Sequence, residues 1–143
     1  MQTSIRATKI VPDGINAHRT LVRQRGGLIS VAIAAGLTLI GAILLWLPGA
    51  IFGVIGYLFI NAGLPLLALT GVPAISGTSR YFIAVIGSVA MWWVIGHFAA
   101  MRATRRAIAG WPEWRREFQP LAIGVWVGTI LALVVTAFVL GAL

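Results

Sequence analysis

The side chains suited to acid–base or metal chemistry are few, and almost all of them lie outside the apolar stretches of this chain. The three carboxylates are Asp13, Glu113 and Glu117, the two histidines are His18 and His97, and there is no cysteine. Proton relays, cation-coupled transport and metal-dependent catalysis in a membrane need ionisable side chains at bilayer depth. Only His97 lies in an apolar stretch, and a haem held by two imidazoles needs a second histidine there. We therefore expect no enzyme activity, no cofactor and no metal site.

Long apolar runs make up most of the remaining sequence. Apolar residues occupy 59% of the 143 positions, whereas charged residues occupy 10%. A helix needs roughly 20 apolar residues to cross about 30 Å of hydrocarbon. Four runs have about that length: 28–47, 50–69, 81–101 and 121–143. The sequence therefore predicts an all-α integral membrane protein, a small polytopic helical bundle with a basic tail over 1–27 and a single membrane domain over 28–143.

The distribution of positive charge indicates how many of these runs cross the membrane. Cations gather in two clusters, one before the first run and one between the third and fourth runs, and both are expected on the cytoplasmic side. If all four runs crossed the membrane, three crossings would lie between the two clusters and would put them on opposite sides. The run 50–69 is the least regular because it contains three glycines, an asparagine and a proline. We therefore expect three full transmembrane helices and one broken, re-entrant segment at 50–69, with four transmembrane helices as the alternative.

Small residues recur every four positions in the first and last runs. A helix face without side-chain bulk lets another helix approach closely, which favours association in lipid. Two tryptophans in the middle of the third run are also candidates, because an indole N–H needs a partner that lipid tails do not provide. Packing within the chain and contact with a partner both remain open for this set. The predicted packing or partner-interface residues are Gly124, Gly128, Ala132, Thr136, Ser30, Ala34, Thr38, Ala42, Trp92 and Trp93.

The connector 102–119 combines cations with aromatic residues. We expect the third helix to continue for about two turns beyond Met101 and to stop at Gly110. A separate amphipathic helix should then start at Pro112, and Pro120 should reset the chain before the last run. This composition suits anionic lipid headgroups or a cytoplasmic docking partner, and a plain connector lying on the membrane is the alternative. The candidate residues are Arg102, Arg105, Arg106, Trp111, Trp114, Arg115 and Arg116.

The small-residue stripes and the scarcity of chemistry favour a protein that packs beside other proteins. The leading hypothesis is a non-catalytic accessory or assembly subunit of a larger bacterial inner-membrane complex, with a lipid-import ABC transporter or a respiratory oxidase assembly as candidate hosts. Ten arginines against one lysine are typical of a GC-rich bacterial genome. The expected partners are the other subunits and anionic phospholipid. Nucleic acid is not expected, because cations beside a span already serve membrane topology. The alternative is a small homo-oligomeric channel or transporter for a neutral or anionic solute.

Overall fold

The computed structural model describes residues 14–70, 77–106 and 109–141, and the regular elements in these ranges are all helices. Three of them are long and apolar enough to cross a membrane: α1 (Gly14–Trp46), α4 (Thr78–Ala103) and α5 (Trp111–Val139). Between α1 and α4 lie a shorter apolar helix, α2 (Ala50–Gly63), and the four-residue α3 (Leu66–Leu69). The predicted all-α membrane fold is confirmed.

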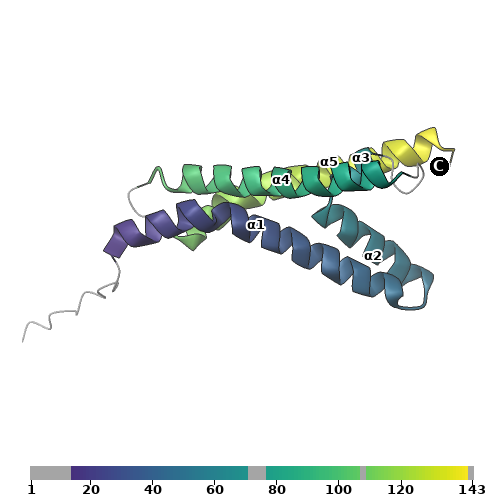
Figure 1. The fold of residues 1–143 in the computed structure, drawn as a ribbon, viewed down its shortest axis with the longest axis horizontal. Coiled ribbons are helices and arrows are strands. Elements are labelled where there is room, and N and C mark those ends of the chain that lie inside the picture. The colour runs from purple at the N-terminus through teal and green to yellow at the C-terminus, as the bar shows by residue number, and fades with distance from the viewer. Residues whose placement is uncertain (1–13, 71–76, 107–108, 142–143) are drawn as a thin grey trace, which may run out of the picture.

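The segment 50–69 turns back within the layer that the long helices span. α2 has 14 residues and measures about 21 Å, which is too short to cross about 30 Å of hydrocarbon. It starts beside the end of α1, runs back along α1 and stops near the middle of the molecule, and α3 then lies against α4 (Figure 1). The end of α1 and the start of α4 therefore lie at the same end of the molecule. The prediction of three full transmembrane helices and one re-entrant segment is confirmed.

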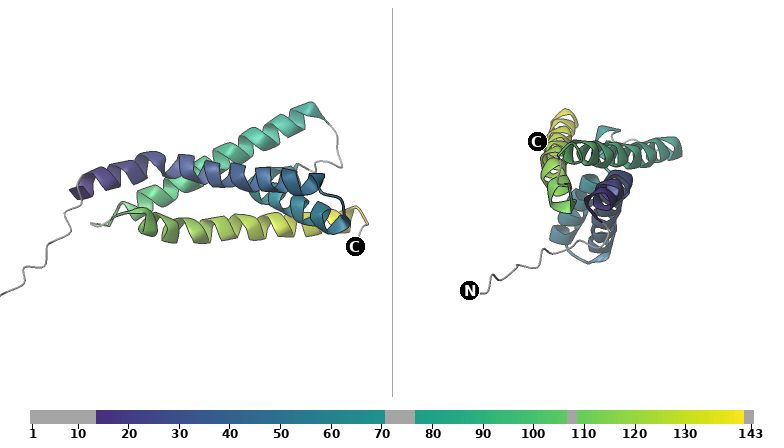
Figure 2. Two further views of the ribbon diagram at one scale, coloured as in Figure 1. Left: turned by 90° about the horizontal axis from the view of Figure 1, so that it is seen from below. Right: turned by 90° about the vertical axis from the view of Figure 1, so that its left-hand side faces the viewer.

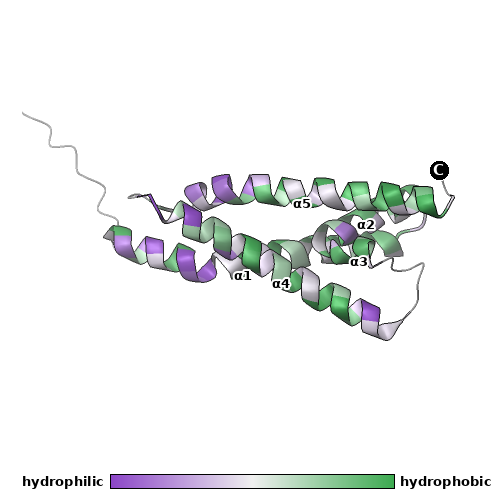
Figure 3. Cartoon of the chain, turned by 90° about the horizontal axis from the view of Figure 1, so that it is seen from above, coloured by the Kyte–Doolittle hydropathy of each residue, from purple (hydrophilic) through white to green (hydrophobic). Residues whose placement is uncertain are grey.

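Polar residues gather at one end of the molecule. That end is formed by the first half of α1, the end of α4 and the start of α5, whereas the α1–α2 turn, the start of α4 and the end of α5 lie at the other (Figure 3). Of the arginines in the described ranges, all except Arg80 belong to the polar end. The three long helices therefore carry their charge on one side of the apolar layer.

Glycines allow the helices to cross at short distance. α1 crosses α4 (Figure 2). The two helices meet at Gly26 and Gly96, where a Cβ on Gly26 would lie 2.6 Å from the Cβ of Ala100. α1 meets α2 at Gly41 and Gly56, where a Cβ on either residue would lie within 2.8 Å of the other's carbonyl oxygen. Backbones approach this closely only where side chains are absent, and such contacts hold helices together in lipid.

The core lies between α1, α4 and α5 and combines alanines with aromatic rings. The rings of Trp114 and Phe118 stack with their centroids 4.6 Å apart, and Trp92 lies 6.0 Å from Phe118. Small alanines on one helix leave room for these rings on the next, which gives dense packing without a long-chain aliphatic core. The buried core residues are Val22, Ala34, Trp92, Ala99, Ala100, Ala103, Trp114, Phe118 and Ala122.

The third span ends sooner than the sequence predicts. α4 stops at Ala103, and Thr104 follows as its C-cap. The backbone N–H and the hydroxyl of Thr104 both donate to the carbonyl of Ala100, at 3.0 and 2.8 Å. A threonine hydroxyl that bonds to a nearby carbonyl competes with regular helix continuation. The two further turns predicted beyond Met101 are therefore wrong.

The last helix begins earlier than predicted and includes most of the connector. α5 starts at Trp111, where Glu113 accepts a 2.9 Å hydrogen bond from the backbone N–H of Gly110. The helix then runs through Pro120 without interruption, so the predicted separate short helix and the reset at Pro120 are wrong. Proline removes one helical hydrogen bond, the one to the carbonyl four residues earlier. Here that carbonyl belongs to the exposed Arg116 at the polar end, where water or headgroups can replace the bond.

Part of the predicted basic tail is helical. Residues 14–27 form the first half of α1, which has 33 residues in total. A helix of that length measures about 50 Å, well beyond the hydrocarbon thickness. The cations in this part of the tail therefore sit on a continuation of the first span, while residues 1–13 lie outside the described ranges.

Candidate functional site

Tryptophans satisfy the backbone where the re-entrant segment breaks. A helix end leaves its last carbonyls without intrahelical partners, and at membrane depth an unpaired carbonyl costs several kcal/mol. The indole N–H of Trp92 donates to the carbonyl of Gly63 at 2.9 Å, and that of Trp126 donates to the carbonyl of Ala62 at 3.2 Å. These two side chains, from α4 and α5, therefore stabilise the end of α2 inside the protein.

α4 also holds the point where the chain restarts. The backbone N–H of Leu66, at the start of α3, donates to the hydroxyl oxygen of Ser88 at 3.2 Å. Ser88 is fully buried and lies one helical turn before Trp92. One face of α4 therefore contacts both sides of the break, and Trp92 is a structural residue of this chain.

Asn61 borders an apolar groove between α2 and α5. Its amide nitrogen donates to the carbonyl of Tyr57 at 2.9 Å, while its side-chain oxygen is buried without a hydrogen-bond partner among the described residues. The groove has a volume of about 310 Å³ and is lined mainly by aliphatic side chains, with Trp126 and Thr129 on the α5 side. A buried oxygen without a hydrogen-bond partner costs stability. As an amide, Asn61 also offers no acid or base.

The small-residue stripe of the first run lies on the inner side of α1. The hydroxyl of Ser30 donates to the carbonyl of Trp92 at 2.5 Å. Ala34 lies so close to α2 that a Cβ on Gly63 would be 2.5 Å from its carbonyl oxygen. Thr38 and Ala42 continue the stripe along an apolar groove between α1 and α4 that measures about 360 Å³. Ser30, Ala34 and Thr38 therefore pack against the protein's own helices, and Ala42 lines the groove.

The stripe of the last run lies partly on the outside. Gly124 and Gly128 are exposed, and a Cβ on either residue would have no atom within 4 Å. Ala132 and Thr136 are half-buried, and the Thr136 hydroxyl donates to the Ala132 carbonyl at 2.8 Å. A four-residue repeat drifts by about 40° per step around a helix of 3.6 residues per turn. The stripe therefore turns from the lipid side toward the protein.

The outward face continues through different residues. Leu131 and Val135 lie seven and eleven positions after Gly124, which is the spacing of one helix face, and they are 59% and 60% exposed. We call Gly124, Gly128, Leu131 and Val135 the glycine face of α5. Within the described ranges no other helix covers the two glycines.

The two central tryptophans have opposite environments. Trp92 is 2% exposed and Trp93 is 45% exposed. Trp93 stacks on His97 one turn later, with ring centroids 5.1 Å apart and an interplanar angle of 2°. The described residues contain no group of three or more His, Cys, Asp or Glu side chains able to hold a metal ion. The described contact of His97 is therefore with the ring of Trp93.

The predicted headgroup residues share the polar end but divide into two groups. The cations are exposed at that end: Arg102, Arg105, Arg106, Arg115 and Arg116. Arg102 and Arg106 approach Glu117 at 3.8 and 3.7 Å. Trp114, by contrast, is buried and donates its indole N–H to the carbonyl of Gly96 at 3.0 Å, with Trp111 half-buried beside it. The tryptophans therefore face the helix bundle, and only the arginines are presented outward.

Two structural contacts were missed at the level of the sequence. Trp126 was not among the predicted residues, but it caps α2 at the break. Arg19 was counted only as a topology signal, but its guanidinium donates to the carbonyl of Thr104 at 2.6 Å and ties α1 to the end of α4. An indole well inside a predicted span was the available signal for Trp126. No sequence pattern pointed to the Arg19 contact, which joins residues 85 positions apart.

No protein-family model, curated protein or solved structure matches this chain. The internal hydrogen bonds at the break, the exposed glycine face of α5 and the arginines of the polar end are the features that bear on function.

Proposed function

We propose that this protein is a non-catalytic accessory or assembly subunit of a larger complex in a bacterial inner membrane, and that the glycine face of α5 packs against a transmembrane helix of its partner. The main support is that some glycines of the helices contact a neighbouring helix and others do not. Gly26, Gly41 and Gly56 each touch the backbone or side chains of a neighbouring helix, whereas Gly124 and Gly128 touch nothing and lie one turn apart on the same helix. Gly36 and Gly53 also touch nothing, but neither has a second uncovered glycine one turn away. Glycine weakens a helix relative to alanine, so an uncovered glycine pair suits a helix that approaches from outside.

The polar side chains of the spans support the same proposal. A transport pathway through a single chain needs polar groups that face the path. Here most hydroxyl and indole donors at bilayer depth are directed to backbone carbonyls of the chain itself, as found for Ser30, Thr38, Thr129, Trp92 and Trp126. These groups maintain the fold of the monomer, which favours a packing role over solute transport.

The proposed orientation puts the polar end in the cytoplasm. Arginines flanking a span favour the cytoplasmic side, and this end contains all the arginines of the described ranges except Arg80. The first half of α1 is then cytoplasmic, and the break in the re-entrant segment is reached from the opposite side. The glycine face of α5 lies within the bilayer in either orientation.

Purification from the native membrane in mild detergent tests the proposal. We expect the tagged chain to recover a larger membrane protein in stoichiometric amount. The double variant Gly124→Leu/Gly128→Leu should lose that partner, because two leucines fill the face that the partner helix would occupy. Gly36→Leu is the matched control, since a Cβ at Gly36 also has no atom within 4 Å but lies on α1.

A lone monomer from the unaltered membrane would count against the proposal. A homo-oligomer that supports selective flux in liposomes containing only this protein would instead favour the channel or transporter. Loss of the partner from Gly36→Leu to the same degree as from the double variant would show that the glycine face is not the contact.

A further inference from the structure

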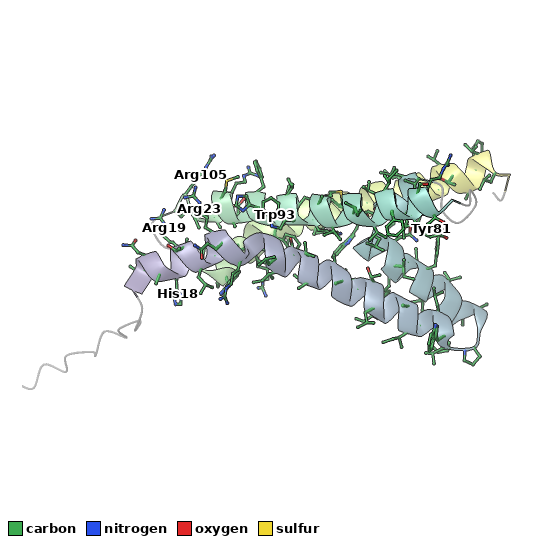
Figure 4. The ribbon with its side chains drawn as sticks, viewed as in Figure 1. His18, Arg19, Arg23, Tyr81, Trp93 and Arg105 are labelled. Carbon is green, nitrogen blue, oxygen red and sulfur yellow. The ribbon has the colours of Figure 1, made fainter. Side chains whose placement is uncertain are left out.

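A polar pocket lies between the first turns of α1 and the end of α4, away from the break and from the glycine face. It has a volume of about 240 Å³ and is lined by Asn16, Arg19, Thr20, Arg23 and Thr104. The four α1 residues are spaced as i, i+3, i+4 and i+7, so they share one side of the helix. Figure 4 shows Arg19 and Arg23 on the side of α1 that faces α4, with His18 on the opposite side. We call this the arginine pocket.

The arginine pocket carries positive charge that the described chain does not neutralise. One nitrogen of the Arg19 guanidinium donates to the carbonyl of Thr104 at 2.6 Å, which fixes its position and leaves its other N–H groups available. Thr104 itself is only 6% exposed. The ion pairs within residues 14–70, 77–106 and 109–141 join Glu117 to two other arginines. The two guanidiniums of the pocket therefore remain without a carboxylate in this part of the chain.

The free hydrogen-bond donors of the pocket are guanidinium and amide groups. The hydroxyl of Thr20 already donates to the carbonyl of Asn16 at 2.9 Å, and that of Thr104 donates to the carbonyl of Ala100 at 2.8 Å. Guanidinium groups match the oxygens of a phosphate in pairs, with charge-assisted hydrogen bonds that are stronger than neutral ones. Two guanidiniums one helical turn apart can therefore share one tetrahedral oxyanion.

The Arg23 side of the arginine pocket lies close to the depth expected for lipid phosphates. Arg23 precedes Leu28, the start of the first apolar run, by five residues, which is about 7 Å along a helix. The headgroup layer outside the hydrocarbon core is itself about 5–7 Å thick on each side. Long arginine side chains also bend toward the interface. An anion reaching Arg23 from the membrane is therefore a lipid headgroup.

We propose that the arginine pocket binds the phosphate oxyanion of an anionic phospholipid headgroup. Inorganic phosphate presents the same oxyanion, so the test separates the two sources. The proposal does not depend on the partner contact of α5, because the two surfaces lie at different depths and share no residue.

Titration of phosphatidylglycerol into the full-length chain in neutral detergent micelles, read by native mass spectrometry, tests this site. We expect one retained phosphatidylglycerol and an apparent affinity at least about fivefold weaker in Arg23→Gln, from the loss of one cation near the lipid surface. Arg23 makes no hydrogen bond within the described ranges, so this variant should fold normally. Arg116→Gln is the control, because it removes the same charge from the polar end outside the pocket. At about 0.15 M salt, where charges farther apart than about 8 Å are screened, its affinity should change by less than about twofold.

Equal phosphatidylglycerol affinities of Arg23→Gln and the unaltered chain would overturn the proposal. An equal loss in Arg116→Gln would also overturn it, because it would show a general charge effect. Millimolar inorganic phosphate is the second probe. If it displaced the lipid from the unaltered chain but not from Arg23→Gln, the ligand would be a soluble phosphate, and the assignment to a lipid would be wrong. We expect no displacement.

Discussion

At the scale of single residues, the indole N–H groups explain how a broken helix is stable inside a membrane. Trp92 and Trp126 come from different helices and donate to adjacent carbonyls of α2, at Gly63 and Ala62. Each bond removes an unpaired carbonyl from an apolar environment, where water is not present to replace it. The tryptophans therefore serve the re-entrant fold and are not available to a partner.

Replacing Trp92 with phenylalanine should destabilise the protein. Trp92→Phe keeps an aromatic ring in the core but leaves the Gly63 carbonyl without its donor, and we expect a loss of about 1–2 kcal/mol. Trp93→Phe is the matched control, because it keeps an aromatic ring beside His97 and removes an indole N–H that makes no hydrogen bond within the described ranges. Its stability should change by less than about 0.5 kcal/mol. Unfolding in mixed detergent micelles measures both, and equal losses would contradict the assigned bond.

The sequence could not distinguish these two tryptophans. Trp92 and Trp93 are neighbours in one apolar run, and which of them faces inward depends on the rotation of α4 against α1 and α5. That rotation is set by contacts between distant residues, such as Ser30 with Trp92. For the same reason a four-residue repeat correctly indicated small residues in α5 but did not separate the exposed Gly124 from the half-buried Thr136.

At the scale of elements, glycine pairs set the distances between helices. α1 and α2 form a hairpin whose closest approach is at Gly41 and Gly56. The hairpin positions the end of α2 next to Trp92 and Trp126, so a change in the distance between α1 and α2 also changes the hydrogen bonds from these tryptophans. The re-entrant segment therefore depends on both the glycine pair and the tryptophan bonds.

Gly41→Ala should loosen the hairpin. A Cβ at this position would lie 2.7 Å from the carbonyl oxygen of Gly56, and the backbones must separate to admit it, at a cost of about 1–3 kcal/mol. Gly36→Ala on the same helix meets no atom within 4 Å and should be neutral or more stable by up to about 1 kcal/mol. Denaturation of the two variants side by side measures the difference. An unchanged stability of Gly41→Ala would show that the helices are farther apart than the structure has them.

The elements were partly predictable from the sequence. The conflict between charge distribution and hydropathy correctly indicated that 50–69 does not cross. The positions of the arginines determine the topology more strongly than the hydropathy of one irregular run does. The connector was predicted incorrectly, because proline ends a helix only where its lost hydrogen bond is not replaced. Whether Pro120 is exposed to water or to an apolar environment depends on how the helices pack together. In this bundle Trp114 and Phe118 pack against α1 and α4.

At the scale of the whole molecule, three crossings place the polar end on one side of the membrane and the start of α4 on the other. The chain contains no cysteine, so single-cysteine variants report on position without background. Gly77, just before α4, and Gly110, just before α5, lie at opposite ends of the apolar layer.

Labelling with a membrane-impermeant maleimide should therefore separate the two positions. We expect Gly77→Cys to react in intact cells and Gly110→Cys to react only after the inner membrane is permeabilised, because the arginine-rich end is cytoplasmic in the proposed orientation. The opposite result would contradict the re-entrant topology, because four crossings with a cytoplasmic first half of α1 place Gly77 inside and Gly110 outside. Reaction of both positions from one side would contradict a crossing by α4.

Photo-crosslinking in the native membrane tests whether a partner helix covers the glycine face of α5, as proposed. A photoreactive residue at Leu131 or Val135 lies on that face, whereas one at Ile86 lies on the outer side of α4 and is 64% exposed. We expect Leu131 and Val135 to form one discrete adduct with a larger membrane protein and Ile86 to form none. Adducts with lipid alone at all three positions, or adducts with the mass of two copies of this chain, would contradict the claim.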